Sequence, residues 1–203
     1  VEEGTVLGLL GPNGAGKTTV VRMLSTLLPP SSGEATVAGA DLRREPAPVR
    51  RHIGHVSQEG GGAEEATGRI ELVTQGRLYD MSKDDSGRRA QELIDSLQLA
   101  DCAERGVKTY SGGQKRRLDV AIGLMHKPQL LFLDEPTTGL DPQSRSHMWE
   151  EVRALRASGI TVFLTTHYLE EADALCDRLA IIDHGRIVAD GDSDAVRGSR
   201  WPS

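Results

Sequence analysis

The sequence predicts an α/β fold with a mostly parallel sheet, and three observations support this prediction. Apolar runs without alternation occur at residues 5–10, 130–133 and 161–164, as in strands that are covered on both faces. Helical patterns lie between these runs, as the crossover connections of a parallel sheet require. The 203 residues, 27% charged and 37% apolar, are enough for one globular domain with a sizeable core.

Two helices can be predicted from their ends and their apolar spacing. Asp141 can cap the first helix, Pro142 suits its first position, and Gly159 supplies a left-handed residue beyond its end. Its predicted core face consists of Met148, Val152 and Leu155. The second helix is expected from about Ser86, with a core face formed by Ala90, Leu93, Ile94 and Leu97.

The domain organisation follows from these elements. We expect residues 1–203 to form a single domain, in which a mainly helical subdomain of about residues 70–125 is inserted into the α/β core. Near the end of the chain, residues 179–182 and 186–189 flank His184-Gly185, a short connection that predicts a β-hairpin.

Composition and charge restrict the classes of function. A net charge of −6 and a pI near 5.5 disfavour a general nucleic-acid or anionic-lipid surface. Lys115-Arg116-Arg117 is the only dense basic cluster, and its usual interpretation is a solvated helix face. No apolar run approaches the roughly 20 residues of a membrane span, and no secretory signal is recognisable, so we expect a cytoplasmic location. Cys102 and Cys176 are expected to be buried and reduced.

Residues 11–18 follow a predicted strand, precede a predicted helix, and match the phosphate-loop pattern G-x-x-x-x-G-K-[ST]. Glycines let the loop turn its backbone N–H groups toward phosphate oxygens, and the helix N-terminus adds to the attraction. Lys17 is expected to reach the β- and γ-phosphates of ATP, and the Thr18 hydroxyl to bind Mg²⁺. A glycine-rich turn that only caps a helix is the alternative. The predicted nucleotide-binding residues here are Gly11, Pro12, Asn13, Gly14, Ala15, Gly16, Lys17, Thr18 and Thr19.

A second candidate group follows the apolar run at residues 130–133. Asp134 lies at the carboxyl end of this predicted strand, where open α/β sheets bind ligands, and is expected to hold Mg²⁺. Glu135 follows directly and is positioned to orient or deprotonate an attacking water. The alternative is that the two carboxylates only cap the next helix.

Tyr110-Ser111-Gly112-Gly113-Gln114 lies between these two elements and resembles the signature motif of ABC ATPases. Ser111 is a good N-cap, and the two glycines leave backbone N–H groups open to an anion. The resemblance implies that the start of this helix contacts the γ-phosphate of ATP held by a partner subunit, so that ATP lies at a dimer interface. The residues assigned to this contact are Ser111, Gly112, Gly113 and Gln114.

Three further residues match the family in order. Gln58 resembles the Q-loop glutamine, which contacts Mg²⁺ and water and couples to transmembrane partners. Asp141 belongs to a Gly-Leu-Asp sequence that resembles the D-loop, which crosses the dimer interface. His167 resembles the H-loop histidine that contacts the γ-phosphate, whereas a lone histidine at a strand end is usually structural. The resemblance therefore implies Glu135, His167 and Gln58 as catalytic residues, and Thr18, Gln58 and Asp134 as the metal site.

The resemblance covers about residues 6–192, and the local sequence at residues 67–69, 76–79 and 168–172 is similar to exporter ATPases of drug and antibiotic resistance. It implies an ATP-hydrolysing motor that uses ATP and Mg²⁺, works with a transmembrane permease and a second nucleotide-binding domain, and lies at the inner face of the membrane. No nucleic-acid partner is expected. The alternatives are an ABC ATPase of translation or DNA repair, and a nucleotide-binding module without turnover.

The chain departs from the family pattern at two places. Family members usually carry further N-terminal strands and an aromatic residue that stacks on adenine, but no aromatic residue precedes Tyr79. We therefore expect base stacking worth about 1–3 kcal/mol to be lost, and part of the antiparallel layer to be missing, with an exposed sheet edge. Gly60-Gly61-Gly62 follows the Q-loop and is expected to be flexible where a partner would dock.

Overall fold

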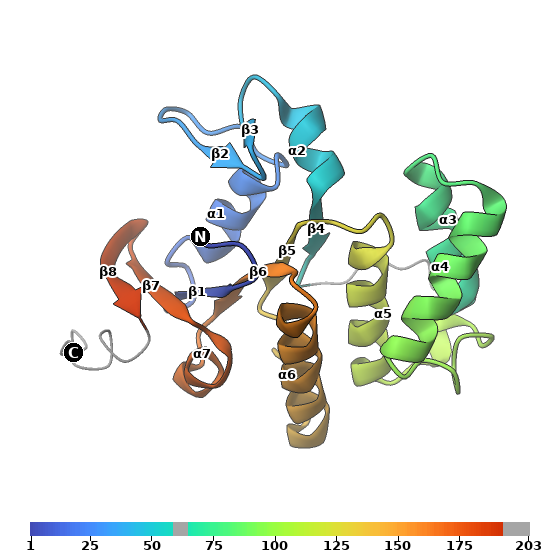
Figure 1. Ribbon diagram of the computed structural model, residues 1–203. Helices are drawn as coiled ribbons and strands as arrows, with labels where there is room; N and C mark the ends of the chain where they lie inside the picture. The colour runs from blue at the N-terminus through green and yellow to red at the C-terminus, as the bar shows by residue number, and fades with distance from the viewer. Residues whose placement is uncertain (59–64, 193–203) are drawn as a thin grey trace.

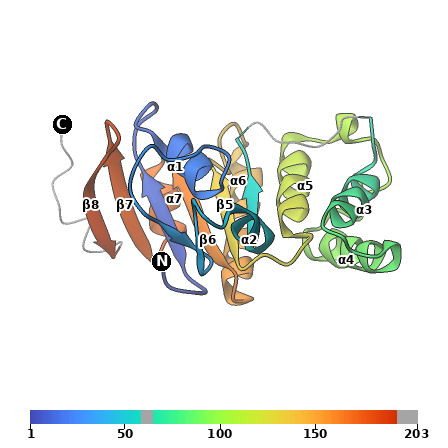
Figure 2. The same cartoon turned by 90° about the horizontal axis from the view of Figure 1, so that it is seen from above.

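The computed structural model describes residues 1–58 and 65–192, so the glycine run at residues 60–62 lies outside the described residues. Its centre is a six-stranded sheet with the strand order β4-β5-β6-β1-β7-β8. Seen from above, the strands follow one another across the molecule, and helices α5, α3 and α4 continue the row beyond the β4 edge (Figure 2).

Five of the six strands run parallel, which confirms the predicted fold class. They are β1 (Val6–Leu10), β4 (Ile53–Val56), β5 (Leu130–Asp134), β6 (Thr161–Thr166) and β7 (Arg178–Asp183). β1 lies between β6 and β7, and β5 lies between β4 and β6. The carboxyl ends of these strands meet at one edge of the sheet, where α/β proteins bind their ligands.

The antiparallel part of the fold is small. β8 (Arg186–Asp192) pairs antiparallel with β7, and the two-residue strands β2 (Thr36–Val37) and β3 (Ala40–Asp41) form a second sheet. His184 and Gly185 connect β7 to β8 with φ angles of 45° and 76°, and positive φ at both positions is typical of a two-residue hairpin turn. The predicted hairpin is therefore confirmed.

Helices cover both faces of the sheet (Figure 1). α1 (Lys17–Leu24) and α2 (Pro46–His52) lie above it together with the small sheet, whereas α6 (Pro142–Ala157) and α7 (Leu169–Leu175) lie below. The prediction for α6 is confirmed, because Asp141 Oδ1 accepts from Ser144 N at 2.9 Å and Gly159 follows with a φ of 88°. Met148 and Val152 are buried on its core face.

The region beside β4 is helical. It contains α3 (Gly68–Leu78), α4 (Lys83–Ser96), a 3₁₀ turn (Val107–Thr109) and α5 (Gly112–Leu124). α4 starts three residues before the predicted position because Ser82 Oγ accepts from Asp85 N at 3.0 Å and caps it there. Its predicted core face is buried, as are Cys102 and Cys176, both of which are free thiols. Burial raises the pKa of Cys176, and the charges of Glu171, Asp177 and Asp173 add to this effect. No helix within residues 1–58 and 65–192 is both long and apolar enough to cross a membrane.

Candidate nucleotide-binding site

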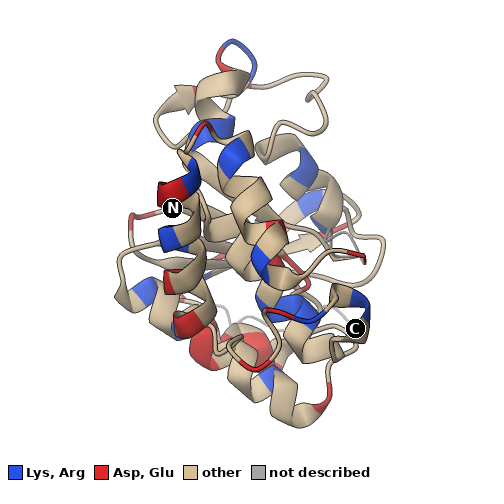
Figure 3. Ribbon diagram, turned by 90° about the vertical axis from the view of Figure 1, so that its right-hand side faces the viewer, with Lys and Arg blue, Asp and Glu red and all other residues tan. Residues whose placement is uncertain are grey.

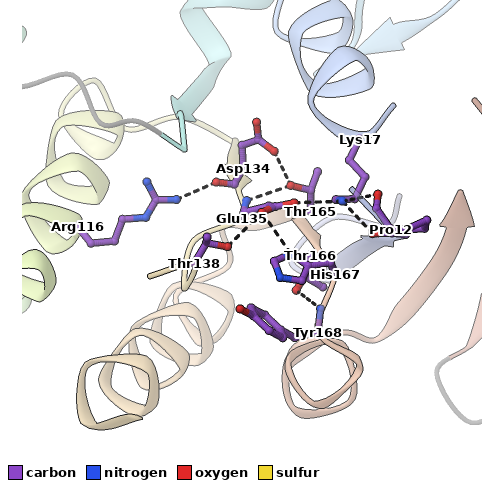
Figure 4. Close-up of polar contacts among 11 residues, drawn as sticks. Pro12, Lys17, Arg116, Asp134, Glu135, Thr138, Thr165, Thr166, His167 and Tyr168 are labelled. Carbon is purple, nitrogen blue, oxygen red and sulfur yellow. Dashed lines mark hydrogen bonds and ion pairs between the residues drawn. The ribbon is translucent and has the colours of Figure 1, made fainter. Parts of the chain in front are cut away.

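The phosphate loop (residues 11–18) connects the end of β1 to the start of α1. Gly16 precedes the helix with a φ of 106°, which only glycine adopts without strain, and no side chain caps the helix start. Lys17 is buried, and its Nζ donates to the carbonyl oxygens of Gly11 at 2.8 Å and Pro12 at 3.0 Å. The ammonium group is thereby held against the first two residues of the loop, and Figure 4 shows its contact with Pro12.

Asp134 ends β5 and is bound from the neighbouring strand β6. Thr165 is fully buried and donates from its Oγ1 to Oδ1 of Asp134 at 2.5 Å. The same Oγ1 accepts from the backbone N–H of Glu135 at 3.0 Å. One hydroxyl therefore orients the carboxylate of Asp134 and the backbone of Glu135 together.

The Glu135 carboxylate lies at the centre of the site and is 8% exposed. Its Oε1 lies 3.1 Å from Nζ of Lys17, and its Oε2 accepts from Thr138 Oγ1 at 3.1 Å. Nδ1 of His167 lies 3.3 Å from the same Oε2. The phosphate loop, the end of β5 and the end of β6 thus converge on this carboxylate (Figure 4).

Two properties of Glu135 agree with a chemical role. Its φ of 46° lies in the left-handed region, where a residue with a side chain is strained. Burial raises the pKa of its carboxyl group, but the hydrogen bond and charge of Lys17, with Thr138 and His167, more than offset this and leave the pKa below its ordinary value. Glu135 is therefore held as an acceptor at neutral pH.

His167 follows β6 directly and is partly buried. Its ring centroid lies 3.9 Å from that of Tyr168, whose backbone N–H donates to Thr166 Oγ1 at 3.0 Å. These contacts fix the turn after β6, so the imidazole lies beside Glu135.

Gln58 lies at the same edge of the sheet on an exposed segment. Val56 pairs with Leu133, so Gln58, two residues further on, lies past the level of Asp134. Its side chain is exposed. The preceding carbonyl, that of Ser57, accepts from Nη1 of Arg116 at 2.6 Å.

The signature segment (residues 110–114) starts α5, and its cap is stronger than predicted. Ser111 Oγ accepts from Gln114 N at 3.2 Å, and the Gln114 side chain accepts in return from Ser111 N at 3.0 Å. This is a capping box, and the spacing Ser-x-x-Gln could have predicted it. A Cβ added at Gly113 would lie 2.7 Å from Ser144 Oγ, so the start of α5 lies against the start of α6 rather than against the phosphate loop.

The structure therefore brings one group of predicted residues together and leaves a second group apart. Lys17, Asp134, Glu135 and His167 form the first group, with Thr18 partly buried at the start of α1. Ser111 and Asp141 are exposed, and their side chains cap α5 and α6.

The interpretation of Lys115-Arg116-Arg117 as a solvated face is wrong for its middle residue. Arg116 is 7% exposed and donates to three backbone carbonyls, those of Ser57, Asp134 and Pro136. The interpretation fails because α5 packs against β4, so one face of this basic run is turned inward. The sequence prediction missed Thr138, whose hydroxyl donates to Glu135 Oε2. Its position three residues after Glu135 could have indicated this contact, because side chains at that spacing often meet in a turn.

The polar groups of the site fit a nucleoside triphosphate with Mg²⁺. One buried ammonium lies in a loop of glycines, and a hydroxyl and a carboxylate, those of Thr18 and Asp134, lie near strand ends at the same edge of the sheet. Within the described ranges, no three His, Cys, Asp or Glu side chains gather as a metal site. Mg²⁺ is usually held by one or two protein groups and by phosphate oxygens, so this arrangement is what such a site requires.

The fold and site define a phosphate-loop nucleotide-binding protein of the α/β class. Comparison with protein families places residues 1–138 in the family described as ABC transporter. The chain belongs to this family.

Three relatives illustrate the similarity. The daunorubicin resistance ATP-binding protein DrrA2 of Streptomyces coeruleorubidus is 54% identical over 97% of this chain and 61% of its own length. The daunorubicin/doxorubicin resistance ATP-binding protein DrrA of Streptomyces peucetius is 53% identical over 98% and 60%. A solved ATP binding subunit of an ABC transporter is 29% identical, with a TM-score of 0.84 over 97% of this chain and 82% of that one. The chain spans about 60% of the length of the two resistance proteins.

Proposed function

We propose that this chain binds ATP with Mg²⁺ and hydrolyses it as the motor of a membrane exporter of drugs or other hydrophobic compounds. The observation that carries this proposal is the Glu135 carboxylate, held between Lys17 of the phosphate loop and His167. A base in this position can orient and deprotonate a water next to the terminal phosphate.

The proposed division of labour follows from the contacts. Lys17 would turn from the loop carbonyls to the β- and γ-phosphates, which releases the Glu135 carboxylate to accept a proton from water. His167 would hold the γ-phosphate beside it, and Thr165 keeps Asp134 and Glu135 in position. Catalysis in this scheme depends on positioning and charge, with no covalent intermediate on the protein.

Thr18, Asp134 and Gln58 are the residues that we propose to hold Mg²⁺. The ion would neutralise charge on the phosphate oxygens when it is bound. The exposed position of Gln58 suits a residue that also senses a partner.

We also propose that two nucleotide-binding domains close head to tail around ATP. The exposed capping box at Ser111 supports this, because it lies at a helix N-terminus that could meet an anion held by a second chain, and the exposed Asp141 could contact that chain directly. In this arrangement the helical region around residues 70–125 acts as a subdomain that presents α5 to the partner.

The proposed surface for the permease is a pocket of about 720 Å³ between α2 and the ends of α3, α4 and α5. It is lined by five basic and three acidic side chains, in a chain whose net charge is −6. The rings of Tyr79 and His126 stack inside it at a centroid distance of 3.8 Å. On the side that the helices form, Asp and Glu are more frequent in the lower half of the view, whereas Lys and Arg occur in both halves (Figure 3). The basic residues are Arg50, Arg51, Arg88, Arg89 and Lys127.

We infer that this pocket receives an acidic cytoplasmic segment of a permease, which places the chain at the inner face of the membrane. Arg51→Glu with Lys127→Glu should weaken copurification with the cognate permease and leave ATP turnover of the free chain unchanged. Arg186→Glu on β8 is the matched control, and it should change neither copurification with the permease nor ATP turnover. Undiminished copurification of the double variant would contradict this surface.

The function itself is tested by steady-state ATP turnover measured against protein concentration, with Glu135→Gln as the control. A rate that rises faster than linearly, and that Glu135→Gln abolishes, is the expected result. Absence of turnover above the control would favour the alternative of a nucleotide-binding module without turnover. Copurification with ribosomes or DNA instead of membranes would favour the other alternative, an ABC ATPase of translation or DNA repair.

A further inference from the structure

Arg116 occupies an unusual position between two parts of the molecule. It lies on α5, two residues after Gln114, yet its guanidinium group reaches into the core of the site. Nε donates to the Pro136 carbonyl at 2.9 Å, Nη1 to the Ser57 carbonyl at 2.6 Å, and Nη2 to the Asp134 carbonyl at 2.9 Å. Three nitrogens of one rigid plane are thereby used at once.

Two of the three acceptors flank Glu135. The carbonyls of Asp134 and Pro136 belong to the residues immediately before and after it, and the residue between them has a φ of 46°. On the other side, the Glu135 N–H is held by Thr165. The strained backbone of Glu135 is therefore held from two directions, by β6 and by α5.

The third acceptor belongs to the segment before Gln58. Arg116 thus fixes the end of β4 relative to the end of β5, and both relative to the helix whose first residues form the signature segment. A guanidinium group suits this task because its donors point outward in a fixed plane, whereas an ammonium group would bring all its donors to a single point.

We propose that Arg116 is a positioning residue, which holds Glu135 and the segment before Gln58 in place relative to α5, so that a shift of α5 changes the position of the catalytic carboxylate. The inference rests on the proposed function, because it assigns an effect on turnover to the placement of Glu135. Binding of ATP in the phosphate loop does not require Arg116, since none of these three hydrogen bonds is with residues 11–18.

Arg117 provides a matched control on the same helix. Its Nη1 donates to the carbonyls of Leu97 and Gln98 at 3.2 and 3.0 Å, so it also ties α5 to backbone carbonyls. These acceptors lie after α4 and away from Glu135. Loss of either arginine should lower stability, but only loss of Arg116 should disturb the site.

The kinetic test compares Arg116→Gln, Arg116→Lys and Arg117→Gln in the full chain with its partner domains. We expect Arg116→Gln to lower kcat about 10-fold or more, as for loss of a group that orients a catalytic residue, with KM for ATP changed less than about 2-fold. Arg116→Lys should restore only part of kcat, and Arg117→Gln should leave kcat unchanged. Equal losses in the two glutamine variants, or a loss confined to KM, would overturn the proposal.

The separation of positioning from ATP binding is tested in a Glu135→Gln background, where turnover is absent. There, Arg116→Gln should change the Kd for ATP by less than about 2-fold, because none of its hydrogen bonds is with the phosphate loop. A merely structural role, in which the whole site is disturbed, would instead weaken ATP binding. Failure of the proposed function is recognised by a different result, equal ATP turnover in wild type and Glu135→Gln.

Hydrogen exchange decides the role of Arg116 without any measurement of turnover. The backbone around Glu135 should exchange faster in Arg116→Gln than in wild type, and at the wild-type rate in Arg117→Gln, where residues 97–99 should be affected instead. Unchanged exchange around Glu135 in Arg116→Gln would overturn the positioning role.

Discussion

Two fully buried threonines, Thr165 and Thr137, differ in what their hydroxyls contact. Thr165 Oγ1 has two hydrogen bonds at the site, whereas Thr137 Oγ1 is buried and has no hydrogen-bond partner among the residues that the structure describes. Thr165→Val should therefore lower the free energy of unfolding by about 1–3 kcal/mol and reduce ATP turnover, because the buried Asp134 Oδ1 loses this donor and the Glu135 N–H keeps only its 3.2 Å bond to the Thr165 carbonyl. Thr137→Val removes an unpaired hydroxyl and should leave stability unchanged or raised. Urea unfolding of both variants measures this, and an equal cost would contradict it.

The lowered pKa of Glu135 predicts how its contribution to stability depends on pH. An acid whose folded pKa lies below its ordinary 4.5 stabilises the fold above that pH, and the contribution is lost as the pH falls through the folded pKa. As the pH falls below about 4.5, wild type should thus lose free energy of unfolding relative to Glu135→Gln. Glu151 shows the opposite shift, because burial and the negative charge of Glu150 raise the pKa of its carboxyl group above the ordinary value.

Glu151→Gln is therefore the control, since its difference from wild type should shift in the opposite direction as the pH falls. Denaturant unfolding from pH 6 to pH 3 measures both differences. A pH-independent difference for Glu135→Gln would contradict the lowered pKa.

For individual residues, the sequence predicts which side chains form the site from their type and spacing, but it does not predict their orientation. The motifs predict that Lys17, Asp134 and Glu135 share one sheet edge, and the structure brings them together there. Arg116 is wrongly assigned to solvent because a run of three basic residues carries no information about which one faces β4. Only the packing of α5 on the sheet decides that.

Among the elements, the caps of α5 and α3 can be compared directly. Ser111 and Thr67 each accept a hydrogen bond from the backbone N–H three residues on, at 3.2 and 3.3 Å. Each change to Ala should lower the free energy of unfolding by about 0.5–2 kcal/mol. Only Ser111→Ala should also reduce ATP turnover of the dimer, because only α5 is proposed to meet the nucleotide. Equal turnover of the two variants would contradict that role.

The contact of β4 with α5 depends on two glycines. A Cβ on Gly54 would lie 2.3 Å from the Gly123 carbonyl oxygen, which is backbone and cannot move aside. A Cβ on Gly123 would meet Val56 Cγ2 at 3.1 Å and Leu131 Cδ1 at 3.2 Å, which are side-chain ends. Gly54→Ala should therefore cost about 1–3 kcal/mol or more, and Gly123→Ala clearly less, since alanine also favours the helix by about 0.5–1 kcal/mol. Thermal unfolding ranks the two variants, and the reverse order would contradict the packing.

Element ends are predictable where the signal is local. Asp141 and Pro142 predict the start of α6, and His184-Gly185 predicts the turn before β8. The predicted start of α4 is late because its apolar spacing begins only after the first turn, while the cap at Ser82 lies outside that pattern.

For the molecule as a whole, the exposed caps at Ser111 and Asp141 predict that ATP drives self-association. Glu135→Gln should sediment as a dimer with ATP and Mg²⁺ and as a monomer with ADP, because hydrolysis no longer separates the two copies. Adding Lys17→Ala should abolish the dimer, since the phosphates lose their buried cation. A monomer under every condition would contradict a sandwich between two copies and direct attention to a second, different domain.

The strand order also has a consequence for how the protein is made. Val6 of β1 pairs with Val162 of β6, and Leu10 pairs with Ile181 of β7, so the first strand inserts between two of the last. On the ribosome, β1 emerges long before either neighbour and must wait for both. The phosphate loop at its end therefore gains its final shape only after β6 and β7 have been synthesised. A nascent chain stalled before β6 should hold no ATP, and binding should begin once β7 has emerged.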